Sequence, residues 1–190
     1  MAGARLLRRF ARANHLANLR LQRACAQLAP GEWEAPRAGF FPSLRATLNH
    51  ILIVDRFYID ALEGGDLGPA AFVDREPCRA LPDLAAAQAE MDLRLIALVD
   101  GLAGSDLARI VRVHRGARVQ TDRMDDVLGH LFLHQTHHRG QAHAMLSSTS
   151  VAPPQLDEFI VGDDAAARRE DLARLGWNEA LLMGDAAGQS

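Results

Sequence analysis

The sequence predicts an all-α fold, an up-down four-helix bundle with a small β-hairpin before the last bundle helix and a short C-terminal helix. Two observations predict it: apolar residues recur at helical spacing over four long segments, and glycine or proline stands between these segments. A bundle buries the apolar stripes of such helices against one another. At 190 residues the chain is long enough for one hydrophobic core. We therefore expect a single domain over residues 1–190, with a C-terminal extension from about residue 149.

The first helix is expected from about Ala4 to Leu28, before Pro30 and Gly31. Its start is amphipathic and rich in arginine, as a transit peptide would be, but it has no serine and no break in its apolar period. We therefore interpret it as the first helix of the bundle.

The second helix is expected from Ser43, whose side chain suits an N-cap, to about Glu63, where two glycines follow. Its middle, HILIVDRFYI, is apolar almost all round, which is typical of a helix that is buried on most sides. The third helix is expected from about Pro82, a favourable first-turn residue, to about Leu102.

A strand-like pattern follows in ARIVRVHRGARVQTDR, where apolar residues lie on both sides of Arg115–Gly116. This pattern predicts a short β-hairpin that must pack against the helices to be stable. Near the C-terminus a last helix is expected over residues 165–175, with Asp163 or Asp164 as its N-cap and Gly176 after its end.

The expected fourth helix, from about Arg123 to Ser147, holds five of the chain's eight histidines, in GHLFLHQTHHRGQAH. His134 and His138 are four residues apart, so both lie on one face of a helix, where two imidazoles can hold one metal ion. His130 lies one turn nearer the start of the helix, slightly rotated around the helix axis from this pair, and is an additional candidate ligand. The other two histidines point further away.

A metal site needs a third ligand, and His50 on the expected second helix is the best candidate. A buried imidazole must find a partner, and taken alone a backbone carbonyl is the more common one. Facing helices of a bundle bring such groups to the same depth. The presence of His50 therefore strengthens the interpretation of the pair on the fourth helix as metal ligands, and the pair strengthens the same interpretation of His50. Because the ligands bind as neutral imidazoles, we expect metal affinity to fall as pH drops through the ordinary histidine range, about 6.5.

Residue types disfavour several other functions. The histidine pair is similar to the HExxH zinc helix, but Gln135 stands where that motif has its catalytic glutamate, which disfavours a peptidase. All 21 basic residues are arginine, which excludes a P-loop lysine and a lysine Schiff base. Cys25 and Cys78 form no CxxC pair and fit a reducing cytoplasm.

Composition also limits the expected partners. A net charge of −3 and an aromatic content of 5% disfavour nucleic acid. No apolar run reaches the length of a membrane span, so no membrane partner is expected. A small-molecule substrate is the expected partner.

Two stretches, TLNHILIVDRFYIDALEG and LGHLFLHQTHHRGQAHAML, resemble the DinB-like superfamily of four-helix bundles, bacterial proteins named after a damage-inducible gene. The resemblance covers most of the chain. It implies a metal site in which His50 matches the histidine of the second helix and His134 and His138 match the two of the fourth, with zinc or nickel as the usual metal. It also implies a homodimer. Some relatives are thiol-dependent transferases or isomerases that use mycothiol, bacillithiol or glutathione.

The sequence and the resemblance together predict a cytoplasmic metal-dependent enzyme with thiol-dependent S-transferase or hydrolase chemistry. Three imidazoles leave a fourth metal position open for water, substrate or a low-molecular-weight thiol such as glutathione. The alternative is a non-catalytic metal-binding or stress-response module, in which the bundle serves dimerisation.

Other residues are weaker candidates for the site. Asp55 could orient an imidazole or act as a base, Arg139 could bind a carboxylate, and Gln141 could orient a ligand. An ion pair between helices explains Asp55 and Arg139 at least as well, and Gln141 could instead bond the C-terminal tail. Phe40 and Phe41 are expected to anchor a loop on the core rather than to line a substrate pocket.

Overall fold

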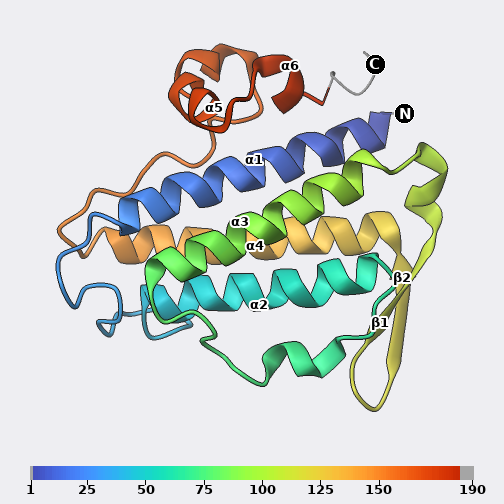
Figure 1. The fold of residues 1–190 in the computed structure, drawn as a ribbon, viewed down its shortest axis with the longest axis horizontal. Coiled ribbons are helices and arrows are strands. Elements are labelled where there is room, and N and C mark those ends of the chain that lie inside the picture. Colours follow the sequence, from blue (N-terminus) through green and yellow to red (C-terminus); the bar gives the residue numbers. More distant parts are fainter. Residues whose placement is uncertain (1, 185–190) are drawn as a thin grey trace.

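The computed structural model describes residues 2–184, and four long helices that lie side by side make up its body (Figure 1). They are α1 (Ala2–Cys25), α2 (Leu44–Leu62), α3 (Leu81–Asp100) and α4 (Met124–Leu146). α1 and α2 each pack against both α3 and α4, and the apolar sides of the four helices form the main core between them. The helical bundle predicted from the sequence is confirmed. No helix in the described part of the chain is both long enough and apolar enough for a membrane span.

The connection between α2 and α3 runs along the length of the bundle (Figure 1). Asn49, near the start of α2, donates a hydrogen bond to the carbonyl of Cys78 just before α3. Arg94, near the end of α3, binds Glu63 just after α2. α2 and α3 therefore run in the same direction, whereas α1 and α4 run in the opposite direction. This long connection, which contains the 3₁₀ helix η1 (Gly68–Phe72), lies against α2.

The predicted hairpin is present directly before α4. Strand β1 (Ile110–His114) pairs antiparallel with β2 (Val119–Arg123), and Val113 lies opposite Gln120. Val111 and Val113 are buried, and β1 packs against α2 and α4. Because β2 leads into α4 without a loop, the hairpin fixes the position at which α4 begins. A further 3₁₀ helix, η2 (Gly104–Ala108), joins α3 to the hairpin.

The ends of the bundle helices differ from the predicted ends by a few residues. Ser43 caps α2 as predicted, because its Oγ accepts a hydrogen bond of 3.1 Å from the backbone N–H of Ala46. α1 ends at Cys25 rather than at Leu28, because the following residues form a tighter turn in which the N–H of Leu28 bonds the carbonyl of Cys25.

The C-terminal segment packs on the outer side of α1 (Figure 1). The prediction of one helix over residues 165–175 is wrong at its start: a 3₁₀ helix, η3 (Gly162–Ala166), comes first, and α5 (Arg169–Leu175) begins later. Asp163 and Asp164 lie in the first turn of η3 and do not cap α5.

Arg168 lies at this interruption, directly before α5. Its buried guanidinium donates hydrogen bonds to the carbonyls of Glu158 and Val161, which fixes the turn between η3 and α5. Gly176 ends α5 in the left-handed conformation, with a φ of 67°, as predicted. A further short helix, α6 (Glu179–Leu182), follows and was not predicted.

Candidate metal centre

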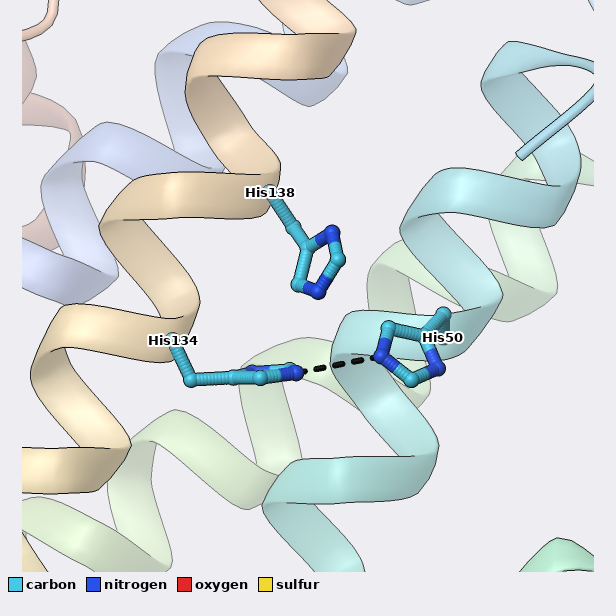
Figure 2. Close-up of side chains that lie close together, drawn as sticks. All are labelled: His50, His134 and His138. Carbon is cyan, nitrogen blue, oxygen red and sulfur yellow. Dashed lines mark hydrogen bonds between the residues drawn. The ribbon is translucent and has the colours of Figure 1, made fainter. Parts of the chain in front are cut away.

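Three imidazoles from two helices converge on one point between α2 and α4 (Figure 2). Nε2 of His50 on α2 and Nε2 of His134 on α4 lie 3.1 Å apart. His138, one turn further along α4, directs its ring towards the same point, and one ring nitrogen of each histidine lies within 4.8 Å of the others. We call His50, His134 and His138 the three-histidine group.

The fold explains why these three side chains meet. α2 and α4 are antiparallel neighbours, and His134 and His138 share one face of α4 because they are four residues apart. His50 lies in the first half of α2, opposite the middle of α4. His138 is buried, with 6% of its surface exposed, and His50 and His134 are half-buried.

The geometry of the group fits a metal ion. Two ligand nitrogens of one tetrahedral zinc ion, each about 2.0–2.1 Å from the metal, lie about 3.3 Å apart. The separation of 3.1 Å between Nε2 of His50 and Nε2 of His134 is close to this value. Three histidine ligands with a fourth position open are typical of catalytic rather than structural zinc.

Burial keeps these imidazoles in the neutral form that a metal ion requires. Burial, with the nearby His138, lowers the pKa of His50 to about 4. Burial, with the neighbouring histidines, lowers the pKa of His134 to about 3. Burial also lowers the pKa of His138, although its hydrogen bond with Gln141 acts in the opposite direction. Protons would therefore compete with a metal ion at this group only at a lower pH than the value of 6.5 expected from the sequence.

Gln141 fixes the ring of His138. Its Oε1 accepts a hydrogen bond of 2.9 Å from Nδ1 of His138, which leaves Nε2 of that ring free to act as a ligand. The Nε2 of Gln141 in turn donates to Nε2 of His137 at 3.0 Å. Of the two contacts considered for Gln141, the structure shows the one with a ring of the group, and it shows no hydrogen bond from Gln141 to the C-terminal segment among the described residues. His134 has no such support, since its buried Nδ1 has no hydrogen-bond partner among the described residues.

A sequence model of the DinB family matches residues 4–170 of the chain. The chain belongs to the DinB family. The matched region includes nearly all of α1, the other three bundle helices and the three-histidine group. Comparison with curated proteins gave no match.

The remaining histidines of this DinB-family protein lie outside the group. His130 is exposed, its ring centroid is 6.4 Å from that of His134, and it packs against Tyr58 instead. His143 donates a hydrogen bond to the carbonyl of Pro154 and so ties the C-terminal segment to α4.

A cavity of about 450 Å³ opens beside the three-histidine group, and His50 and Phe41 both line it. The Phe41 ring lies 4.4 Å from the ring of His50 and 5.5 Å from that of His138, measured between centroids. Phe41 thus packs on the rings of the group, and it also lines this cavity. Phe40 is 77% exposed and packs against Phe41. Two adjacent phenylalanines in an expected loop are the signal in the sequence that could have pointed to this cavity.

Asp55 and Arg139, two weaker candidates, lie away from the three-histidine group in the centre of the bundle. Both are buried, and they belong to a set of hydrogen-bonded side chains from all four bundle helices that we call the buried polar network. Its members are Asn14, His15, Asn18, Asp55, Gln88, Asp92, Gln135 and Arg139.

The carboxylate of Asp55 accepts hydrogen bonds from Gln88 at 2.6 Å and from Gln135 at 2.8 Å. Burial, together with the negative charge of Asp92, raises the pKa of Asp55 to about 7. Each oxygen is thus bonded to a glutamine amide, and neither makes a hydrogen bond with a histidine among the described residues. Asp55 therefore joins α2 to α3 and α4 and does not orient an imidazole.

Arg139 donates hydrogen bonds to the amide oxygens of Asn14 and Asn18 on α1. Burial lowers the pKa of Arg139 to about 10, against the influence of Asp92 and Asp55. Its partners are neutral amides rather than the carboxylate that the sequence suggested. In this position Arg139 joins α4 to α1.

Proposed function

We propose that this DinB-family protein is a metal-dependent enzyme that carries out thiol-dependent S-transfer or hydrolysis at the three-histidine group. One observation carries the proposal: ring nitrogens from two helices converge on one point beside a cavity. Neutral imidazoles do not neutralise a bound cation, so its full charge acts on the remaining position. A divalent ion held there would lower the pKa of a thiol or a water molecule and so supply a nucleophile at neutral pH.

The side chains around the group have separate roles in this proposal. Gln141 holds the His138 ring in the orientation that directs Nε2 towards the ion. Phe41 covers the His50 and His138 rings and excludes water from that side. The substrate enters through the cavity that His50 lines. We propose zinc or nickel as the metal, and glutathione or a similar small thiol as the co-substrate.

We also propose a cytoplasmic location. Cys25 and Cys78 are free thiols, and both are buried. Free thiols persist in the reducing conditions of the cytoplasm.

Metal content is the first test of the proposal. Protein purified without added metal, or dialysed against zinc or nickel, is expected to hold one ion per chain by elemental analysis. His134→Ala is expected to lose the ion. His137→Ala is the matched control, because His137 is on the same helix but outside the group, and it is expected to keep the ion. Equal metal content in the two variants would contradict the site.

Activity is the second test. Chelator treatment is expected to leave the helical circular dichroism in place, since the bundle core does not involve the three-histidine group. A panel of electrophiles and activated esters, tested with several small thiols, is then expected to show turnover that depends on added metal and is absent in His134→Ala. If chelation unfolds the protein, the metal is structural and the enzymatic proposal is wrong.

The second candidate, a module that acts through dimerisation, is favoured by an exposed apolar face. Leu133 on α4 is 73% exposed and Phe10 on α1 is 38% exposed, and both line a mainly apolar cavity of about 460 Å³. We propose that a homodimer forms through this face. Light scattering is expected to give a dimer for the wild type and a monomer for Leu133→Arg. Leu93→Arg, on an exposed apolar residue of α3, is the control and is expected to stay dimeric.

A further inference from the structure

The cavity beside His50 is built on one face of α2. Ala46, His50 and Ile53 line it, and their spacing of four and three residues puts them on the same side of the helix. Ala46 contributes only a methyl group, which leaves space next to the His50 ring. The floor of the cavity is therefore an apolar surface with one ligand histidine in its middle.

The walls of the cavity come from the connections on either side of α2. Phe41 belongs to the connection before α2, and its ring packs on His50 at 4.4 Å between centroids. Phe72 ends η1 in the connection after α2, and its ring packs on Phe57 at 5.2 Å. Two aromatic side chains thus face the space next to His50, which suits the apolar body of a small molecule.

The charged side chains that line the cavity are not equivalent. The carboxylate of Glu76 accepts a hydrogen bond of 2.7 Å from Arg45, so its charge is compensated within the protein. Arg75 lines the same cavity, and it makes no hydrogen bond or ion pair with any residue that the structure describes. The cavity therefore has an aromatic interior next to His50 and an uncompensated guanidinium at its edge.

We infer that the substrate of the three-histidine group is a small carboxylic acid with an apolar body. Its carboxylate binds the guanidinium of Arg75, and its body lies between Phe41 and Phe72. The inference rests on the proposed function, because that function makes the His50 end of the cavity the place of reaction. A guanidinium binds a carboxylate through paired N–H donors, so an acid is favoured over a neutral or cationic molecule of the same shape.

The test uses phenylacetate and its neutral analogue phenylacetamide as probes. Both are titrated into the full-length, chelator-treated protein at neutral pH, so that a metal ion cannot bind the carboxylate. Ligand-observed NMR is expected to show that the acid binds the wild type about 3–10-fold more tightly than the amide, as for a partly exposed charge pair. Arg75→Gln is expected to abolish this preference. Arg79→Gln, at a nearby exposed arginine that does not line the cavity, is expected to keep it.

A second variant locates the body of the probe. Phe72→Ala is expected to weaken the acid and the amide by the same factor and so to keep the preference for the acid. Equal binding of acid and amide to the wild type, no binding of either probe, or an unchanged preference in Arg75→Gln would each overturn the inference.

The outcomes separate this inference from the proposed function. If His134→Ala and the wild type hold the same amount of metal, the enzymatic proposal fails, but the dependence of acid binding on Arg75 stands. If the ion is present and lost in His134→Ala while acid and amide bind alike, the metal site stands and the substrate class is wrong.

Discussion

Two polar clusters each take residues from both α2 and α4. They differ in whether their polar atoms find hydrogen-bond partners within the protein. In the buried polar network, donors and acceptors from four helices pair with one another. The carboxylate of Asp92, for example, accepts hydrogen bonds from Asn14, Asn18 and Gln88. In the three-histidine group the ring nitrogens face one another beside a cavity, and Nδ1 of His134 has no partner among the described residues. The network is thus largely complete within the protein, whereas the histidine group is not.

This difference shows that burial and a shifted pKa do not by themselves mark a functional residue. Asp55 has a pKa raised to about 7 and Arg139 a pKa lowered to about 10, yet both side chains bond to other side chains of the bundle. Structural networks shift pKa values as well as active sites do. The convergence of ring nitrogens beside a cavity is the feature that distinguishes the histidines. We therefore expect network variants to lose stability and histidine-group variants to lose metal.

The largest effect is expected for Asp92→Ala. Its removal takes the carboxylate away from the buried amides of Asn14 and Asn18 on α1, leaves Gln88 with Asp55 as its remaining acceptor, and removes a charge near Arg139. We expect a loss of about 3–5 kcal/mol in the free energy of unfolding and a fall in Tm of roughly 10 °C. Urea and thermal denaturation of the metal-free protein measure both. Glu90→Ala, at an exposed carboxylate of the same helix, is the control. A stability equal to that of the control would show that the network does not hold the bundle together.

Gln141→Ala tests the opposite expectation, a loss of metal without a loss of stability. Without the amide oxygen, Nδ1 of His138 has no acceptor and the ring is less well oriented. We expect metal affinity to fall about 10–100-fold. Competition with a chromophoric chelator measures the affinity. Thr136→Ala, at an exposed residue of α4, should bind metal as the wild type does. A large change in the free energy of unfolding, with unchanged metal affinity, would show that Gln141 stabilises the fold rather than the metal site.

The sequence was sufficient for the part of the site that depends on spacing along one helix. A separation of four residues places His134 and His138 together in any helix, and the buried second helix made His50 the natural third ligand. The general rule that facing helices of a bundle bring such groups to one depth made His50 the candidate, and the resemblance implied the same three histidines. The cavity could not be predicted, because Phe41 and Phe72 lie in connections whose conformation no periodic pattern fixes.

The buried polar network was also missed, although the sequence contains a signal for it. Three of the bundle helices carry polar pairs at a spacing of four residues. These pairs are Asn14 with Asn18, Gln88 with Asp92, and Gln135 with Arg139. Each pair by itself is equally typical of a solvent-exposed face. Only the relative rotation of the helices, which depends on packing between distant segments, decides that all three pairs point inwards.

Asp55→Asn is expected to give a moderate effect that depends on pH. The folded pKa of Asp55, about 7, lies above its ordinary value, so the folded wild type holds a proton that the unfolded chain releases between about pH 4 and pH 7. The stability that this proton contributes is lost as pH rises through 7. The variant carries no such charge, and its Nδ2 can donate to Oε1 of Gln135, which has no partner among the described residues, after that amide rotates.

We therefore expect the stability of Asp55→Asn, relative to wild type, to be more favourable at pH 8 than at pH 5. The expected change is on the order of 1–2 kcal/mol, since one pKa unit corresponds to about 1.4 kcal/mol. Urea denaturation at the two pH values measures it. Glu90→Gln provides the control for removing an exposed charge from the bundle. A difference that does not vary with pH would show that Asp55 is ionised throughout.

The smallest effect is expected from the histidine group in the metal-free protein, and it has the opposite sign. The folded pKa values of His50 and His134, about 4 and about 3, lie below the ordinary value near 6.5. The unfolded chain therefore binds protons that the folded chain does not, and stability falls as pH decreases from about 6.5 towards 4. His134→Ala is expected to lose less stability over this interval than the wild type, and His137→Ala is expected to follow the wild type. Because both half-buried rings reach solvent, the effect should be smaller than that of Asp55→Asn. A wild type and a His134→Ala variant with parallel pH curves would mean that the histidines are hydrated in the metal-free protein, and that protons and metal ions compete near pH 6.5 after all.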